Sequence, residues 1–295
     1  MILLDYLKRQ KNLSMYPYYE RILGKTSGQQ AQILLTLSEY RLKNEKDIKS
    51  YFQLLKGLDG YFDSLIEYSK EQVKRNLFLS DQSLKEVLQQ IQNVIKQKEN
   101  NMLVATFNLR IADIKGINAA QKKKYCRENK KLIGTKVLPA YEKLYSHLQA
   151  LNGNGKNENG LYYYKNGKEY YKVLVAQKTG SDKTIEEMIE ISDRSIEKCL
   201  RKLIKLQKKY PNIINEYRNH KKNIKIVQNP QNILNKLRQK MVKYYPKAPK
   251  VSDEIKYVHK TMEEYTSPAF YMVPEIDSYK ENVIYINKAQ TAELY

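Results

Sequence analysis

The stretch Tyr265–Tyr295 reads YTSPAFYMVPEIDSYKENVIYINKAQTAELY and holds the densest non-helical pattern in the chain. Within it, Asn282–Asn287 (NVIYIN) is a short run of β-branched and aromatic residues, which is typical of a β-strand. Pro268 and Pro274 interrupt the approach to this run, so we expect turns before it. The tail therefore predicts a strand near the C-terminal end of the protein.

Two neighbouring segments have patterns that suit the same sheet. Glu254–His259 alternates polar and apolar side chains, which is the period of a half-buried strand. Ala269–Val273 is a second short apolar and aromatic run. Together with Asn282–Asn287, these segments predict a small sheet.

The rest of the chain shows the apolar period of α-helices. The clearest stripe follows Ser80, and a stripe of this kind usually faces a core; its members are Leu84, Val87, Leu88, Ile91, Val94 and Ile95. Thr184–Glu187 (TIEE) has the spacing of a capping box and should start a long amphipathic helix that Pro211 ends. The expected fold is mainly α (α+β), a multi-helical scaffold with a small β-sheet near the C-terminal end.

A polar, glycine-rich segment offers the best boundary inside the chain. Residues 152–160 (NGNGKNENG) lack any apolar period, which is typical of a surface loop or linker. We therefore expect a helical N-terminal region over residues 1–151 and a region of helices plus the small sheet over residues 161–295. One continuous domain, truncated at its C-terminus, is the alternative. The helical stretch 118–151 contains Pro139, which should bend it.

The chain is strongly basic, with a formal net charge of +21. Such a charge suits a protein that binds nucleic acid or an anionic surface. However, only 10 of the 53 basic residues are arginine, the residue that phosphate and base recognition favours, and lysine is spread over every segment. We therefore expect a solvated, Lys-rich surface. A Lys-rich helical binding protein for nucleic acid or another polyanion is the alternative function.

Three segments, in this order, carry a resemblance to a known family. The first is Val137–Tyr141 (VLPAY) with Leu144, and the second is Asn159–Leu161 leading to Gly167–Tyr171 (GKEYY). The third is Ser267–Tyr271 (SPAFY), followed by a proline, an acidic residue and then the NVIYIN run. In this pattern the sequence resembles the bacterial family known as domain of unknown function 885, and the resemblance covers nearly the whole chain.

The family is similar to zinc metallopeptidases of the zincin type, in which an H-E-x-x-P-G-H helix follows shortly after the I-Y-I-N strand. That motif supplies the metal ligands and the catalytic carboxylate, and this chain does not contain it: His147, His220 and His259 have no second histidine at helical spacing. The resemblance therefore implies the N-terminal scaffold of a zinc-dependent peptidase, inactive as it stands. It implies zinc for the complete family member and no metal-binding or catalytic residue here.

The resemblance also implies a role for the tail. In zincin-type peptidases a strand beside the metal helix pairs with the extended substrate, as a peptide adds to a sheet edge. Asn282–Asn287 would be that strand, and Tyr271 would line the cleft wall. The candidate substrate-binding residues are therefore Tyr271, Asn282, Ile284, Tyr285 and Asn287, with a peptide as the partner. The alternative is that Tyr271, Tyr285 and Asn287 pack or cap the sheet.

A strand that lacks a covering element should expose apolar side chains and an open edge. We therefore expect self-association through the exposed C-terminal strand. No apolar run approaches the length of a membrane helix. Met1–Leu7 is too short and too charged for the apolar region of a signal peptide, which leaves the location open, with the cytoplasm as the default expectation.

Overall fold

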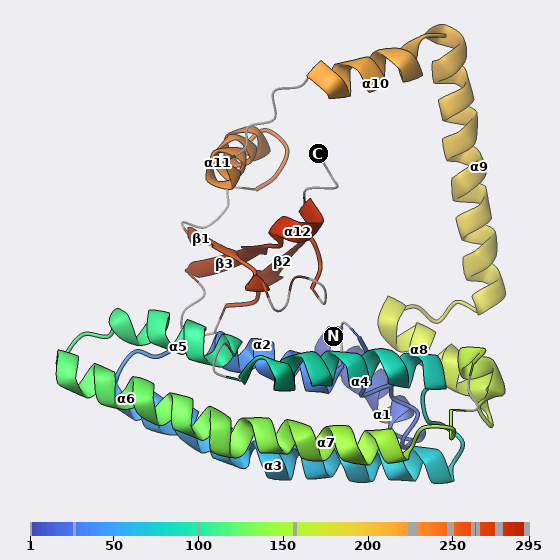
Figure 1. Cartoon of the computed structure of the whole chain (residues 1–295). Helices are drawn as coiled ribbons and strands as arrows, with labels where there is room; N and C mark the ends of the chain where they lie inside the picture. The colour runs from blue at the N-terminus through green and yellow to red at the C-terminus, as the bar shows by residue number, and fades with distance from the viewer. Residues whose placement is uncertain are drawn as a thin grey trace. The chain divides into compact units, whose positions relative to one another are not determined.

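The computed structural model describes residues 2–25, 28–98, 101–155, 158–223, 229–246, 251–260, 263, 266–274 and 280–291. The chain divides into two compact units, Met1–Gly180 and Ser181–Tyr295 (Figure 1). The first unit is helical, and the second contains further helices and the sheet. The predicted fold class, mainly α with a small sheet near the C-terminal end, is confirmed.

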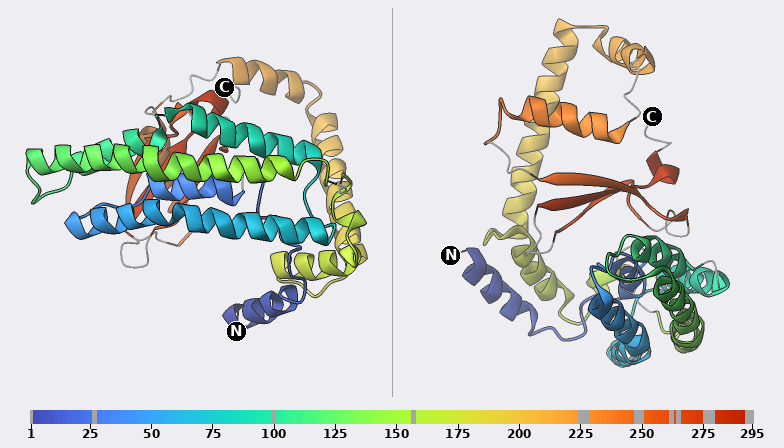
Figure 2. Two further views of the ribbon diagram at one scale, coloured as in Figure 1. Left: turned by 60° about the horizontal axis from the view of Figure 1, so that its bottom comes forward. Right: turned by 90° about the vertical axis from the view of Figure 1, so that its left-hand side faces the viewer.

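In the first unit, α3 (Glu45–Lys74), α4 (Asp81–Lys96), α6 (Ala119–Leu132) and α7 (Leu138–Ala150) run side by side, as the right-hand view of Figure 2 shows end-on. Their caps explain where they begin: Asn44 and Asp47 form a reciprocal capping box at α3, and the Ser80 hydroxyl accepts the Ser83 N–H at the start of α4. The helices are α1 (Ile2–Leu13), α2 (Gln29–Ser38), α3 (Glu45–Lys74), α4 (Asp81–Lys96), α5 (Met102–Ala112), α6 (Ala119–Leu132), α7 (Leu138–Ala150) and α8 (Gly167–Thr179), with a short 3-10 helix, η3 (Gly160–Tyr163).

A single wide turn joins α6 to α7 and marks the predicted disturbance at Pro139. The turn is the π-helical segment η2 (Ile133–Val137). Pro139 has no N–H to donate, and its ring crowds the carbonyl four residues earlier, at Thr135, which lies inside this turn. A π-helical turn relieves that conflict without ending the rod. Residues 119–150 therefore form one rod with a wider turn in its middle.

Aromatic side chains fill the interior of the first unit. Phe107 stacks on Tyr51 and Phe52, with ring centroids 5.4 and 5.7 Å away. Phe62 meets Tyr141 edge to face at 4.7 Å. The predicted stripe of α4 is also confirmed, since Leu84, Val87, Ile91 and Val94 are all buried. Burial of such side chains is the main stabilising contribution in a unit of this size.

The second unit begins with α9 (Ile185–Lys209), which starts after the predicted capping box of Thr184 and Glu187. It is followed by α10 (Ile213–Asn223), α11 (Pro230–Met241) and a four-residue helix, α12 (Lys288–Thr291), at the end of the described chain. Although α9 is amphipathic as predicted, none of its residues is buried. Its packing thus differs from that of every long helix in the first unit.

The sheet has three strands in the order β1-β3-β2. They are β1 (Ser252–Tyr257), β2 (Ala269–Met272) and β3 (Glu281–Ile286), close to the predicted positions. β1 runs parallel to β3 with Ile255 opposite Ile284, and β2 runs antiparallel to β3 with Tyr271 opposite Ile284. β3 is therefore the central strand.

The division between the units lies at Gly180 and Ser181 rather than at the polar loop 152–160. Residues 156 and 157 of that loop lie outside the described residues. The segment after the loop belongs to the first unit, because α8 packs on α1: the Arg9 guanidinium donates to the Ala176 carbonyl at 3.3 Å. Gly180 ends α8 in the left-handed conformation (φ 63°), which suits glycine as a helix C-cap.

Candidate functional site

The five candidate residues of the tail lie on two different faces of the sheet. Side chains alternate along a strand, so Asn282 and Ile284 point to one face while Tyr285 and Asn287 point to the other. Tyr271 lies opposite Ile284 and shares its face. We call the face of Tyr271, Asn282 and Ile284 the polar-network face and the other the stacked face. The structure thus brings together three of the five candidates.

A chain of hydrogen bonds crosses the polar-network face. The Tyr271 hydroxyl donates to Asn282 Oδ1 at 2.6 Å, and Asn282 Nδ2 donates to Asp253 Oδ1 at 3.3 Å. The other oxygen of Asp253 pairs with the Arg238 guanidinium of α11 at 2.5 Å. The Asp253 side chain is only 7% exposed, whereas that of Arg238 is 42% exposed, so the carboxylate of this charge-assisted pair is shielded from water and the guanidinium is not. The network holds the Tyr271 ring over the sheet, although that residue is half exposed.

Arg238 and Asp253 are the two site residues that sequence reasoning missed. Asp253 lies just before Glu254–His259, the alternating run from which β1 was predicted. Extending that predicted strand by one residue towards the N-terminus would have included Asp253, and the sequence offers no other sign of its role. Arg238 lies in α11, and the sequence gives no sign that it belongs to the site. Its contacts with Val251 and Asp253 depend on the tertiary arrangement of α11 and β1.

The stacked face contains buried side chains with structural partners. The Tyr285 ring stacks on Phe270 with centroids 5.0 Å apart and planes at 11°. The amide of Asn287 donates to the Glu263 carbonyl at 2.6 Å and to the Thr266 carbonyl at 3.2 Å, and its Oδ1 accepts the Ala289 N–H at 3.1 Å. Both candidates are buried. Their geometry matches the packing and capping alternative for these two residues.

The expectation that β3 itself offers an open edge is wrong. β3 is hydrogen-bonded to β1 on one side and to β2 on the other, so its main chain is already paired. Its side chains are also less exposed than expected: Tyr285 is buried, and Val283, Ile284 and Ile286 are half-buried. Self-association through β3 would have to break this pairing. Any strand added to the sheet of the described residues must join β1 or β2.

The outer edge of β2 is an open position of this kind. Asn287 N–H donates to the Pro268 carbonyl at 2.8 Å, so Pro268 and Asn287 form a hydrogen-bonded pair. Such pairs alternate along an antiparallel ladder. The main-chain N–H and C=O groups of Phe270 and Met272 therefore point towards β3. The main-chain groups of Ala269 and Tyr271 therefore point away from β3. No described strand pairs with them.

His259 and Glu263 follow β1 in the sequence. Burial lowers the pKa of His259, and the nearby carboxylate of Glu263 acts in the opposite direction. The described part of the chain holds no group of three His, Cys, Asp or Glu side chains that could bind a metal ion.

A cavity with a volume of about 1050 Å³ lies in the first unit. Tyrosines from α1, α3, α8 and the intervening loops line it, among them Tyr16, Tyr19, Tyr68, Tyr164 and Tyr170. Burial, reinforced by the carboxylate of Glu20, raises the pKa of Tyr68 to about 12. The Tyr164 hydroxyl donates to the Leu77 carbonyl at 2.8 Å. Because its raised pKa lies far above neutral pH, the Tyr68 phenol is uncharged there.

The fold and site define a helical chain that carries a small mixed sheet, in which β1 and β2 are both edge strands among the described residues. The sequence profile of the family described as "Bacterial protein of unknown function (DUF885)" matches residues 2–294. The chain belongs to this family. No curated protein matches the sequence.

A solved structure matches the fold over most of the chain. It is "The crystal structure of the putative lipoprotein from Colwellia psychrerythraea", with a TM-score of 0.67 and 17% sequence identity. The match covers 90% of this chain and 49% of the Colwellia chain, so this chain spans about half the length of that protein. Among the described helices, none is both long enough and apolar enough to cross a membrane.

Proposed function

We propose that this chain is the scaffold and substrate-cleft portion of a zinc-dependent metallopeptidase, and that its own part is to hold an extended peptide. The observation that carries the proposal is the unpaired outer edge of β2, where the main-chain groups of Ala269 and Tyr271 point away from the sheet. A peptide that adds to such an edge gains main-chain hydrogen bonds that do not depend on its sequence.

The polar-network face supports the same proposal with side chains. The Tyr271 ring stands beside the open edge and is fixed by Asn282, which Asp253 and Arg238 fix in turn. A preorganised aromatic ring can pack on an apolar side chain of a bound peptide with little loss of conformational entropy. Ile284 adds an apolar surface to this face, while Tyr285 and Asn287 hold the sheet from the opposite side.

The zinc ligands of the proposal do not come from the described residues, which contain no suitable group. They belong to the part of the family fold that this chain does not span. When bound there, zinc would polarise the peptide carbonyl and activate water. The residues of this chain are assigned binding and orientation only, and no catalytic step.

Peptide binding by the chain tests the proposal directly. We expect labelled unstructured peptides to bind the wild-type chain in fluorescence anisotropy. Tyr271→Ala should weaken that binding about 10-fold, a loss typical of one good contact. Tyr257→Ala is the matched control. Tyr257 lies on β1, the edge strand on the other side of the sheet from β2, and is as exposed as Tyr271 (49% against 50%).

A second variant tests the main-chain hydrogen bonds between the β2 edge and a bound peptide. Ala269→Pro removes an N–H that points away from β3, and proline is tolerated on edge strands at such positions. We expect this variant to weaken peptide binding about 10-fold by removing one hydrogen bond. A wild-type chain that binds no peptide, or variants that bind as tightly as the wild type, would contradict the proposal.

A further inference from the structure

The long helix α9 has an apolar stripe that none of the described residues buries. We use this name for Ile189, Ile196, Leu200 and Leu203, which recur at helical spacing on one side and are each more than half exposed. The other long helices of the chain bury their apolar sides, as α3 and α4 do. A contiguous exposed apolar surface of this kind marks an interaction site.

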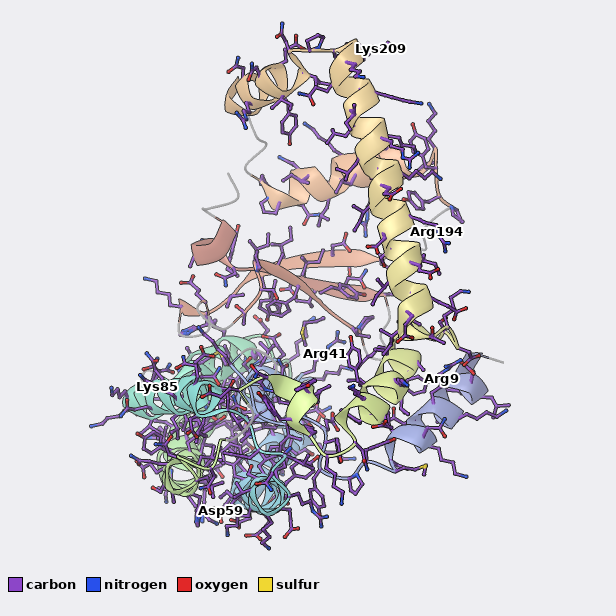
Figure 3. The ribbon with its side chains drawn as sticks, turned by 90° about the vertical axis from the view of Figure 1, so that its right-hand side faces the viewer. Arg9, Arg41, Asp59, Lys85, Arg194 and Lys209 are labelled. Atoms are coloured by element: carbon purple, nitrogen blue, oxygen red, sulfur yellow. The ribbon has the colours of Figure 1, made fainter. Side chains whose placement is uncertain are left out.

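The charges of α9 are divided along its length. The first half, Ile185–Glu197, carries five acidic residues and one basic residue, Arg194. The second half, Lys198–Lys209, carries six basic residues and no acidic one. Figure 3 labels Arg194 and Lys209 on the helix, where both side chains extend outward. The helix dipole favours this arrangement only within the first and last turns, so it does not explain the charges in the middle.

The size of the fold indicates what covers the stripe. The matching Colwellia structure contains about as much chain again as the part that corresponds to this protein. The additional half of such a fold can cover the apolar side of an amphipathic helix that the first half leaves exposed. Isolated helices gain most of their stability from packing of the apolar side, so α9 requires such a partner.

We propose that the α9 apolar stripe is the docking surface for a polypeptide with the fold of the other half of the family, whether carried on the same chain or on a separate one. The docking surface of that polypeptide is apolar, with basic groups near the first half of α9 and acidic groups near the second half. This complementarity fixes the direction in which the partner lies along the helix. The proposal does not depend on peptide binding or on zinc.

Co-expression with a defined partner tests the proposal. The partner is the part of the Colwellia lipoprotein that has no counterpart in this chain, and purification takes place in EDTA, so that the result is independent of metal chemistry. We expect a one-to-one complex by light scattering and slower amide exchange along α9 than in the chain alone. Zinc is then added back to the purified complex after the EDTA has been removed. A complex that forms but shows no zinc-dependent peptidase activity at that stage would count against the proposed function and leave the docking surface intact.

Two variants locate the surface. Leu200→Glu combined with Leu203→Glu should weaken the complex at least about 30-fold, the loss expected for central contacts. Ser195→Ala, on a different side of α9 from the stripe and outside its charge pattern, is the control and should change the affinity less than about 3-fold. Because the stripe is exposed in the free chain, both variants should unfold at the wild-type temperature.

Four outcomes would overturn the proposal. The first is the absence of any complex with the Colwellia part. The second is a free monomer whose α9 amides are already protected, or whose unfolding temperature falls on the Leu200 and Leu203 changes, since the stripe would then be covered within this chain. The third is a dimer through the stripe that the partner does not displace, which would make a second copy the occupant. The fourth is binding of the stripe to anionic lipid vesicles in preference to the polypeptide.

Discussion

Asn287 joins the end of β3 to two neighbouring segments through its amide group. The residue is fully buried, and the amide donates to the carbonyls of Glu263 and Thr266 while accepting the Ala289 N–H. Asn287→Ala would remove these hydrogen bonds to part-buried carbonyls, which costs about 1–3 kcal/mol. We expect faster amide exchange over β3, measured by mass spectrometry. Asn152→Ala, at an exposed position of the first unit, is the control and should leave β3 exchange unchanged.

Tyr141 gives the first unit a sensitivity to high pH. Its buried hydroxyl donates to the Gln30 carbonyl at 2.7 Å, and burial raises the pKa of Tyr141 well above the ordinary value. At neutral pH both the folded and the unfolded state keep this phenol protonated. Above about pH 10 the unfolded state loses the proton first, so the folded state loses stability as the pH rises towards its own higher pKa.

Tyr141→Phe separates the two contributions. At pH 7 the variant should be less stable than the wild type by about 1 kcal/mol, because one hydrogen bond is lost. Between about pH 10 and 11.5 the difference should shrink and then change sign, since the variant has no phenol to ionise. Urea unfolding followed by circular dichroism measures both. Tyr162→Phe is the control, because Tyr162 is 73% exposed; a difference that does not vary with pH for Tyr141→Phe would contradict the prediction.

At the scale of the element, the register of the sheet predicts opposite effects for two prolines in β2. Ala269 directs its N–H away from β3, whereas Met272 directs its N–H towards Val283. Ala269→Pro should change stability by less than about 0.5 kcal/mol. Met272→Pro should cost about 1–3 kcal/mol, because the Val283 carbonyl loses its donor. Amide exchange of Val283 and Tyr285 reports both effects, and equal effects would show that the register is different.

The strands illustrate what local pattern can predict. The alternation in Glu254–His259 and the β-branched run Asn282–Asn287 located β1 and β3, because both signals are local. The order β1-β3-β2 was not predictable, since it depends on pairing between segments distant in sequence. The same limit applies to the site: Tyr271 and Asn282 were named from the sequence, but their contact with Asp253 and Arg238 depends on the tertiary fold.

Across the whole molecule, sequence pattern located the amphipathic helices but not what they pack against. The stripes of α4 and α9 have the same period, and only the structure distinguishes them: Leu84 and Ile91 are buried, whereas Ile196 and Leu203 are exposed. The division of the chain is a second example. The loop 152–160 has linker composition, yet the contact between α1 and α8 keeps the following segment in the first unit.

The two units predict that the first folds without the second. Its interior is built from its own helices, with buried side chains such as Phe62, Phe107 and Tyr141, and Gly180 closes its last helix. We expect a fragment of residues 1–180 to unfold cooperatively by circular dichroism. Its transition should lie within about 3 °C of the corresponding transition of the whole chain, a difference equivalent to about 1 kcal/mol for a unit of this size. A fragment that is unfolded, or that melts far below the whole chain, would show that residues after 180 complete the core of the first unit.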